Sequence, residues 1–342
     1  MSRRQITIIA NWKANLPPSE EVALAKAIAD GLGGASTSAG APSKIRLLLA
    51  PSAIGLVPVA SLLRREYPQA GIEVAAQDAS RTGAGAFTGE LPAEHLVGIV
   101  PAVIVGHSER RRDHGESDEV VGEKLARVVA AGLAPVLCVG DNLPQAEITA
   151  RVEYVQAQCA AAFAAAERAG CSAHQLFAAG LVIAYEPVWA IGTGNPASLE
   201  IAEAIARGLR TTLNRQELPV LYGGSVDAAS AASWFGTPSG RTSLDGLLVG
   251  GASLSADRFV AIARAALAAT DPSCWPALRI EWPSSSSMGL ASAPVGHVMQ
   301  SPPHRCPTGA RSARSTPSHR SEQAAKRLGC PLARWGTARL AT

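Results

Sequence analysis

Three side chains that could carry out acid–base chemistry stand just after short apolar runs of the chain. They are Lys13, His107 and Glu186. Burial raises the pKa of a carboxyl group toward the working pH, where proton abstraction is most efficient, so Glu186 is a candidate general base. A neutral imidazole can donate its proton to a carbonyl oxygen, and a fixed ammonium can stabilise the oxyanion that forms. Together these residues predict proton transfer beside a carbonyl group.

His107 stands where a helix is expected to begin, with Ser108 as the candidate N-cap and Glu109 in the first turn. The positive partial charge at a helix N-terminus disfavours imidazolium, so we expect a neutral imidazole. Each residue alone has an ordinary explanation: a structural histidine, a salt-bridged glutamate or, for Lys13, a solubilising charge. The functional interpretation depends on whether the fold brings them together.

Two Gly-rich turns, Gly223-Gly224-Ser225 and Gly250-Gly251, follow two later apolar runs. Glycine lets backbone N–H groups approach a ligand closely, and concave arrays of such groups bind phosphate. Either turn alone is most simply a loop. Both together, at the ends of successive strands, predict a phosphate site.

Eight short apolar runs separated by helical patterns predict the elements that position these residues. The runs are Ile6–Ala10, Ile45–Ala50, Ile72–Ala76, Val103–Val105, Pro135–Val139, Val182–Ala184, Val220–Leu221 and Gly246–Val249. Helical patterns include Ser19–Ala29, Ser117–Ala131, Ile148–Ala169, Ser198–Leu213 and Ala256–Ala268. This α/β alternation predicts a closed (β/α)8 barrel, whose strands all end at one mouth. An open doubly wound sheet is the alternative, but no GxGxxG follows the first run.

Composition narrows the function class. Of the 342 residues, 47% are hydrophobic, 17% charged and 4% aromatic. No apolar run approaches the roughly 20 residues that span a bilayer, and the N-terminus lacks a signal-peptide pattern, so we expect a cytoplasmic protein. The six cysteines form no CxxC pair and no metal spacing, which predicts neither a metal site nor a disulfide framework. We also expect no cofactor.

The amino-acid composition changes after Thr270, which divides the chain into a predicted barrel domain, 1–270, and a tail, 271–342. The tail is rich in Ser, Pro and Arg and is expected to be disordered. Its nine Lys/Arg and three Asp/Glu carry +6, so the net charge of +3 leaves −3 on the barrel. That distribution is not typical of a nucleic-acid binder. Binding of nucleic acid or membrane by the tail alone remains a weaker alternative.

Five stretches taken together resemble the triose-phosphate isomerase family, and the match covers nearly all of residues 5–268. They are Asn11-Trp12-Lys13, Gly106-His107-Ser108-Glu109-Arg110-Arg111, Tyr185–Gly194, Tyr222–Val226 and Val249–Leu254. The resemblance implies a TIM barrel and an intramolecular aldose–ketose isomerase acting on triose phosphates in glycolysis and gluconeogenesis. The base, the neutral histidine and the closing loop are features that general accounts of catalysis illustrate with this family.

The resemblance also implies residue roles. Glu186 would be the base and His107 the proton shuttle, with Lys13 and Asn11 stabilising charge and Glu109 positioning Lys13. Phosphate would be held by backbone amides, and a lid closed by Tyr222 and Ser225 would cover it. The implied phosphate-binding residues, beside Asn11 and Lys13, are Gly192, Ser225, Gly250 and Gly251; the lid residues are Pro187, Val188, Trp189, Ala190, Ile191, Gly192, Thr193 and Gly194.

A homodimer is implied as well, because Gln77-Asp78 and Ala86–Glu90 resemble the family's loop that inserts into a neighbouring subunit, with Thr88 buttressing the partner's site. Four features depart from the family pattern: Ala14, Asp141, Pro196 and the stretch Asn142–Thr149, which lacks the family's common charged pattern. Asp141 stands where it would meet Trp189, and with Pro196 it puts lid closure in doubt. Two other functions stay open: isomerisation of a four-carbon ketose phosphate, and an inactive barrel used as a scaffold.

Overall fold

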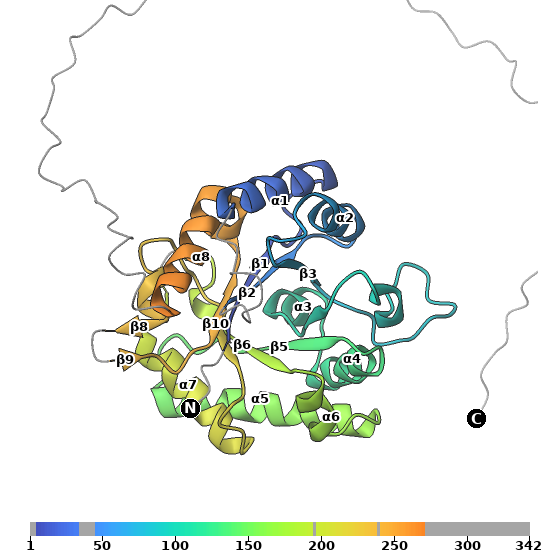
Figure 1. Cartoon of the computed structure of the whole chain (residues 1–342). Coiled ribbons are helices and arrows are strands. Elements are labelled where there is room, and N and C mark those ends of the chain that lie inside the picture. The colour runs from blue at the N-terminus through green and yellow to red at the C-terminus, as the bar shows by residue number, and fades with distance from the viewer. Residues whose placement is uncertain (1–4, 34–44, 194–195, 238–239, 271–342) are drawn as a thin grey trace, which may run out of the picture. The chain divides into compact units, whose positions relative to one another are not determined.

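The structure is a computed structural model that describes residues 5–33, 45–193, 196–237 and 240–270. Eight parallel strands close into a barrel in the order β1-β10-β7-β6-β5-β4-β3-β2. Helices surround the strands (Figure 1). The predicted (β/α)8 TIM barrel is therefore confirmed. The predicted tail, 271–342, lies outside the described residues.

The barrel strands coincide with the eight apolar runs to within three residues at each end. They are β1 (Ile6–Asn11), β2 (Ile45–Ala50), β3 (Ile72–Ala76), β4 (Ala102–Val105), β5 (Ala134–Asp141), β6 (Val182–Pro187), β7 (Val220–Tyr222) and β10 (Gly246–Val249). A two-stranded ribbon, β8 (Gly236–Thr237) with β9 (Gly240–Arg241), precedes β10. The sequence patterns did not predict this ribbon.

The helices lie outside the barrel. They are α1 (Pro18–Leu32), α2 (Leu56–Glu66), α3 (Ser108–Asp113), α4 (Asp118–Ala130), α5 (Ile148–Arg168), α6 (Ala173–Ala178), α7 (Leu199–Thr212) and α8 (Ala256–Thr270). Short 3-10 turns are η1 (Ala93–Leu96), η2 (Val188–Ala190), η3 (Ala231–Trp234) and η4 (Gly251–Leu254). Helix starts have local causes: the Ser117 and Ser198 hydroxyls accept N–H groups of α4 and α7.

Alternating strand residues build two separate apolar layers. On β1, Ile9 faces the barrel interior, whereas Ile6 and Ile8 face the surrounding helices. The interior is filled by side chains, as is usual for this barrel. Its buried members are Ile9, Leu48, Ala50, Ala75, Ala102, Ile104, Val136, Cys138, Val182, Ala184, Leu221 and Leu248. The packed interior leaves the carboxyl ends of the strands as the place for chemistry.

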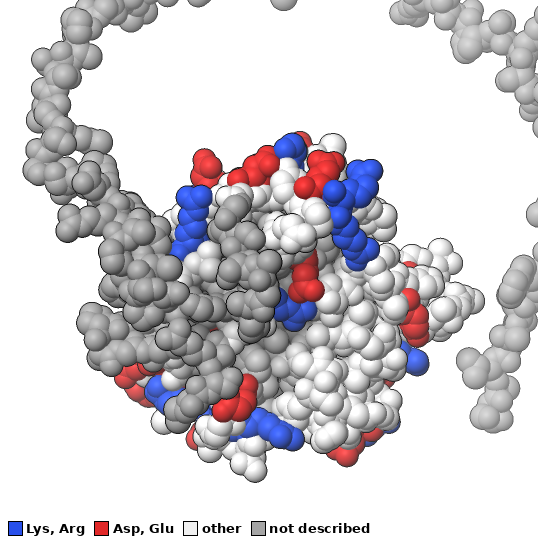
Figure 2. Space-filling view, viewed as in Figure 1, with Lys and Arg blue, Asp and Glu red and all other residues white. Residues whose placement is uncertain are grey.

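Charged side chains of both signs are interspersed on the face of the barrel that Figure 2 shows. No helix in the described part of the chain is both long and apolar enough to cross a membrane. The segment between β3 and β4 extends away from the barrel (Figure 1) and carries Thr88, which is exposed.

Candidate active site

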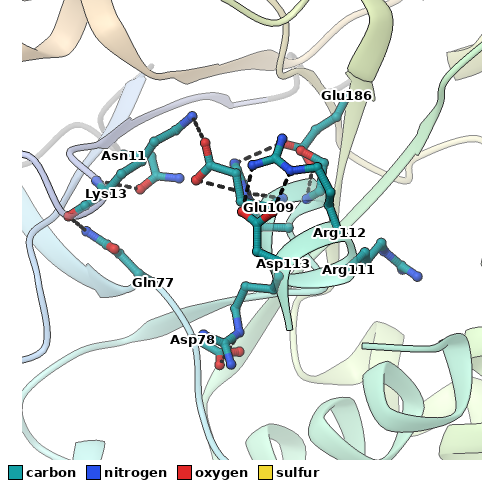
Figure 3. Close-up of polar contacts among 12 residues, drawn as sticks. Asn11, Lys13, Gln77, Asp78, Glu109, Arg111, Arg112, Asp113 and Glu186 are labelled. Carbon is teal, nitrogen blue, oxygen red and sulfur yellow. Dashed lines mark hydrogen bonds and ion pairs between the residues drawn. The ribbon is translucent and has the colours of Figure 1, made fainter. Parts of the chain in front are cut away.

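His107 and Glu186 meet at the carboxyl ends of β4 and β6. His107 Nε2 lies 2.9 Å from Glu186 Oε1, and the two side chains are 8% and 2% exposed. The other carboxylate oxygen accepts a hydrogen bond from the Ser108 backbone N–H at 2.8 Å. Glu186 is thus held against the first turn of α3 (Figure 3).

His107 itself caps α3, and the prediction that Ser108 is the N-cap was wrong. The His107 Nδ1 accepts the backbone N–H of Glu109 at 3.2 Å, and Ser108 is the first helical residue. An Nδ1 that accepts cannot carry a proton. A neutral imidazole here therefore bears its proton on Nε2, the nitrogen that faces Glu186.

The His107–Glu186 contact couples the two titrations. Burial alone would lower the pKa of His107, but the carboxylate of Glu186 outweighs it and raises that pKa above its usual value, which is opposite to the direction expected from the helix N-terminus. Burial alone would raise the pKa of Glu186, but His107, the Ser108 N–H and Lys13 together hold it below its usual value. The expectation of a raised pKa for Glu186 was therefore wrong for this arrangement, because burial was anticipated and its partners were not.

Lys13 reaches the same site from the loop after β1. Its Nζ lies 2.6 Å from Glu109 Oε1 on α3. Its backbone has φ of +54°, a left-handed conformation that costs energy in residues other than glycine. Two bonds hold that conformation: the Lys13 N–H donates to Asn11 Oδ1 at 3.1 Å, and Gln77 Nε2 donates to the Lys13 carbonyl at 2.8 Å. Figure 3 shows Asn11, Lys13 and Gln77 close together opposite Glu109.

One cavity of about 460 Å³ joins the predicted residues. Close packing supports this arrangement: a Cβ added at Gly223 would lie 3.1 Å from Glu186 Cγ, and one at Gly250 would lie 3.9 Å from Lys13 Nζ. The structure thus brings the Gly-rich turns to the acid–base residues. The predicted site residues that line the cavity are Asn11, Lys13, His107, Glu186, Gly192, Ser225, Gly250 and Gly251.

The predicted lid begins at the end of β6. Pro187 closes the strand, the turn η2 covers Val188 to Ala190, and Ile191 to Thr193 follow. Gly194 lies outside the described residues. Ser225 Oγ donates to the Ala190 carbonyl at 3.1 Å, and the Ala197 N–H donates to the Tyr222 hydroxyl at 2.9 Å. The first bond ties the lid to the loop after β7, and the second ties Ala197, just beyond the lid, to the last residue of β7.

Asp141 makes no hydrogen bond to the Trp189 indole within the described residues. Asp141 is fully buried at the end of β5; one oxygen accepts from Arg151 Nη1 and the other from the Tyr185 hydroxyl, each at 2.7 Å. The Arg151 guanidinium instead lies 4.7 Å from the centroid of the Trp189 ring. Among the described residues the Trp189 indole nitrogen has no hydrogen-bond partner. Arg151, a residue of α5, is thus the group that contacts the lid tryptophan.

A cluster of ion pairs anchors α3 to α4 and to the loop after β3. Lys124 of α4, with a side chain 4% exposed, donates to both oxygens of Asp78 and to Glu116. Arg110 of α3 contacts the same two carboxylates. The cluster links the loop after β3, which carries Gln77, to the helix that carries Glu109.

Sequence reasoning missed several residues of this site. Gln77 was assigned only to the expected dimer loop, although it directly follows β3, so the strand-end rule could have identified its role beside Lys13. Arg151 lies inside a helix, and the role of Ser108 belongs to its backbone, so neither gave a signal. Cys138, Cys159 and Cys171 are buried free thiols, and no cluster of three His, Cys, Asp or Glu in the described ranges could hold a metal ion.

Known proteins share these features of sequence. A family model described as triosephosphate isomerase matches residues 6–266. The triosephosphate isomerase of Paracidovorax citrulli is 40% identical over 272 residues, which cover 78% of this chain and 100% of the relative. The same-named protein of Ectopseudomonas mendocina is 45% identical over 233 residues, 66% of this chain and 87% of the relative. That of Rhodopirellula baltica is 36% identical over 274 residues, 78% and 99% of the two chains.

The family model spans all eight barrel strands and includes every strand end that contributes to the cavity. The resemblance carried by the five sequence motifs is thereby confirmed. The chain belongs to the triosephosphate isomerase family.

Proposed function

We propose that the chain interconverts dihydroxyacetone phosphate and D-glyceraldehyde 3-phosphate through an enediolate, a step of glycolysis and gluconeogenesis. The observation that carries the proposal is the 2.9 Å contact between His107 Nε2 and Glu186 Oε1 at the wall of the cavity that Lys13 and Gly250 also line. The reaction needs a base, a proton donor, a fixed cation and a phosphate site. The proposal includes no cofactor and no metal.

In the proposed reaction, the Glu186 carboxylate removes a proton from the carbon next to the carbonyl carbon of dihydroxyacetone phosphate. The electron pair moves onto the carbonyl oxygen, which receives the Nε2 proton of neutral His107. His107 regains a proton from the neighbouring hydroxyl, and the Glu186 carboxylic acid returns its own proton to the former carbonyl carbon. The atoms balance, since the product differs only in which carbon bears the carbonyl.

Other residues act on charge and position. The ammonium of Lys13 and the amide of Asn11 stabilise the developing oxyanion. Glu109 positions Lys13, as their 2.6 Å contact supports. Gly192, Ser225, Gly250 and Gly251 offer backbone N–H groups to the phosphate, since all four line the cavity. The lid, residues 187–194, excludes water so that the enediolate does not lose phosphate.

A coupled assay in both directions tests the proposal, with Glu186→Gln as the variant that lacks the base. We expect turnover of both triose phosphates and a loss of at least about a hundredfold in the variant. Equal or faster turnover of a four-carbon ketose phosphate would favour the alternative isomerase. A folded wild-type chain without turnover on either substrate would indicate an inactive scaffold.

We also propose that the chain acts as a homodimer in the cytoplasm. A second cavity of about 420 Å³ lies beside Lys13, with Ala53 and Leu56 in its wall, and Ile54 next to them is 73% exposed. The protruding loop carries exposed Thr88 and Phe87, which suit insertion into such a cavity of a neighbouring copy. Light scattering on the full chain and on a variant ending at Thr270 tests this, and also whether the tail, 271–342, is a separate part. A monomer with full activity would refute the dimer.

A further inference from the structure

One cation in the cavity wall has no part in the proposed chemistry. Arg258 lies in the first turn of α8 and lines the same cavity as Gly192, Ser225 and Gly250. Its backbone N–H bonds to Ser255, but its exposed side chain makes no recorded hydrogen bond or ion pair within the described residues. The guanidinium is therefore available to a ligand.

The charges around the cavity give Arg258 its significance. Besides His107, the titratable side chains that line it are two cations, Lys13 and Arg258, and two carboxylates, Glu186 and Asp227. Hydrogen bonds from the Ser230 backbone and side chain hold the pKa of Asp227 below its usual value, so it stays ionised. Without Arg258 the two carboxylates would outnumber the single ammonium. A phosphate ester with nearly two negative charges would then approach a cavity of the same sign.

We propose that Arg258 is a recruiting residue, which attracts doubly charged phosphate esters to the cavity and lowers their KM without taking part in proton transfer. The inference rests on the proposed function, because it assigns a substrate charge to the same site. It differs from the roles of Lys13 and the peptide N–H groups, because Arg258 acts during approach and binding.

The expected size follows from Coulomb's law. One positive charge facing two negative charges at roughly 10 Å in water changes the local ligand concentration about fourfold without screening, and about threefold at 10 mM ionic strength, where the Debye length is about 30 Å. Charge reversal doubles the change in energy, which gives about sevenfold at 10 mM ionic strength. At 0.2 M salt the Debye length is below about 10 Å, so the effect falls to less than about threefold even for the reversal. If Arg258 were only a solvent-exposed residue of the helix, its substitution would cause no salt-dependent change in ligand concentration at the cavity.

The test compares Arg258→Gln and Arg258→Glu with Arg264→Gln and Arg264→Glu. Arg264 lies on the same helix, is exposed, donates to the Gly31 carbonyl at 2.8 Å and does not line the cavity. The control pair therefore changes the net charge equally. The quantities to measure are kcat and KM for glyceraldehyde 3-phosphate at about 10 and 200 mM ionic strength, and the affinity for inorganic phosphate by 31P NMR titration.

We expect an unchanged kcat and a fall in kcat/KM of about threefold for Arg258→Gln and about sevenfold for Arg258→Glu at low salt, largely lost at high salt. Phosphate affinity should fall in parallel, and the Arg264 variants should match the wild type. Arg258 variants that behave like the Arg264 variants, or a loss independent of salt, would overturn the inference. A wild-type chain that binds phosphate but does not isomerise would refute the proposed function instead, while the phosphate titration would still decide the role of Arg258.

Discussion

Replacing Arg151 by methionine should destabilise the barrel and release the lid tryptophan. Arg151 is 2% exposed and Asp141 is 0% exposed, and their contact is 2.7 Å long. Methionine fills similar space but leaves the carboxylate without its cation. Removing one partner of a buried ion pair costs about 3–5 kcal/mol, and the stacking of the guanidinium on Trp189 contributes about 0.5–2 kcal/mol more.

Thermal unfolding measures the first effect. In a domain of this size 1 kcal/mol moves the Tm by roughly 2–4 °C, so the ion pair alone predicts a drop of roughly 6–20 °C. The matched control is Arg168→Met on the same helix, where an exposed arginine pairs with exposed Glu119. Such surface pairs contribute about 0–1 kcal/mol, so the control should lose no more than about 4 °C.

Fluorine NMR on protein labelled with 5-fluorotryptophan measures the second effect, with the Trp189 resonance assigned by substitution. We expect Arg151→Met to shift and sharpen that resonance as the indole gains freedom, and to raise KM more than it lowers kcat. Adding Asp141→Asn to Arg151→Met should recover part of the lost Tm, because the unpaired charge is removed. If Arg151→Met has the same Tm as Arg168→Met and the Trp189 resonance is unchanged, the proposed role of Arg151 in holding Asp141 and Trp189 is refuted.

Three further predictions concern the site itself. Glu186→Asp retracts the carboxylate by about 1 Å and should lower kcat at least about a hundredfold in the coupled assay; full turnover would show that another group is the base. The pH dependence of Tm tests the pairing of Glu186 with His107. The pKa of His107 is raised and that of Glu186 is lowered. Their contact therefore stabilises the fold fully between the ordinary pKa values of glutamate and histidine, about 4.3 and 6.5. The stabilisation is lost as pH rises through the raised pKa of His107 or falls through the lowered pKa of Glu186. The Tm advantage of the wild type over Glu186→Gln should therefore be largest near pH 5.5 and shrink by pH 9, and an advantage independent of pH would contradict the pairing. Gln77→Leu removes the donor to the Lys13 and Ala50 carbonyls and should lower kcat roughly tenfold by misplacing the ammonium, whereas an unchanged kcat would mean that Asn11 alone holds the loop.

The barrel was predictable because buried parallel strands are continuous apolar runs, and each run stops where the chain leaves the core. Helix α6 also had a readable signal, the capping box of Ser172 and Gln175, but at six residues it fell below the length of the patterns used. The ribbon of β8 and β9, two residues in each strand, had no apolar pattern to reveal it.

The sequence predicted which residues form the site better than it predicted their contacts and pKa shifts. Residue types at strand ends placed Lys13, His107 and Glu186 at one mouth, because that follows from topology alone. The direction of the pKa shift in Glu186 did not follow, since it depends on a backbone N–H and an imidazole whose positions are set by α3. The contact of Arg151 with Trp189 depends on how α5 is rotated against the barrel, and helical periodicity leaves that rotation open.

The left-handed backbone at Lys13 makes heat resistance and catalysis conflicting requirements at this position. Glycine would adopt the same φ without the steric cost of roughly 1–2 kcal/mol, which exceeds the roughly 0.4–1 kcal/mol that glycine adds to the entropy of the unfolded chain, so the fold would become slightly harder to melt. It would also delete the ammonium that faces Glu109. Laboratory selection for heat resistance alone should therefore discard this lysine early, whereas selection for growth on triose phosphates should retain it.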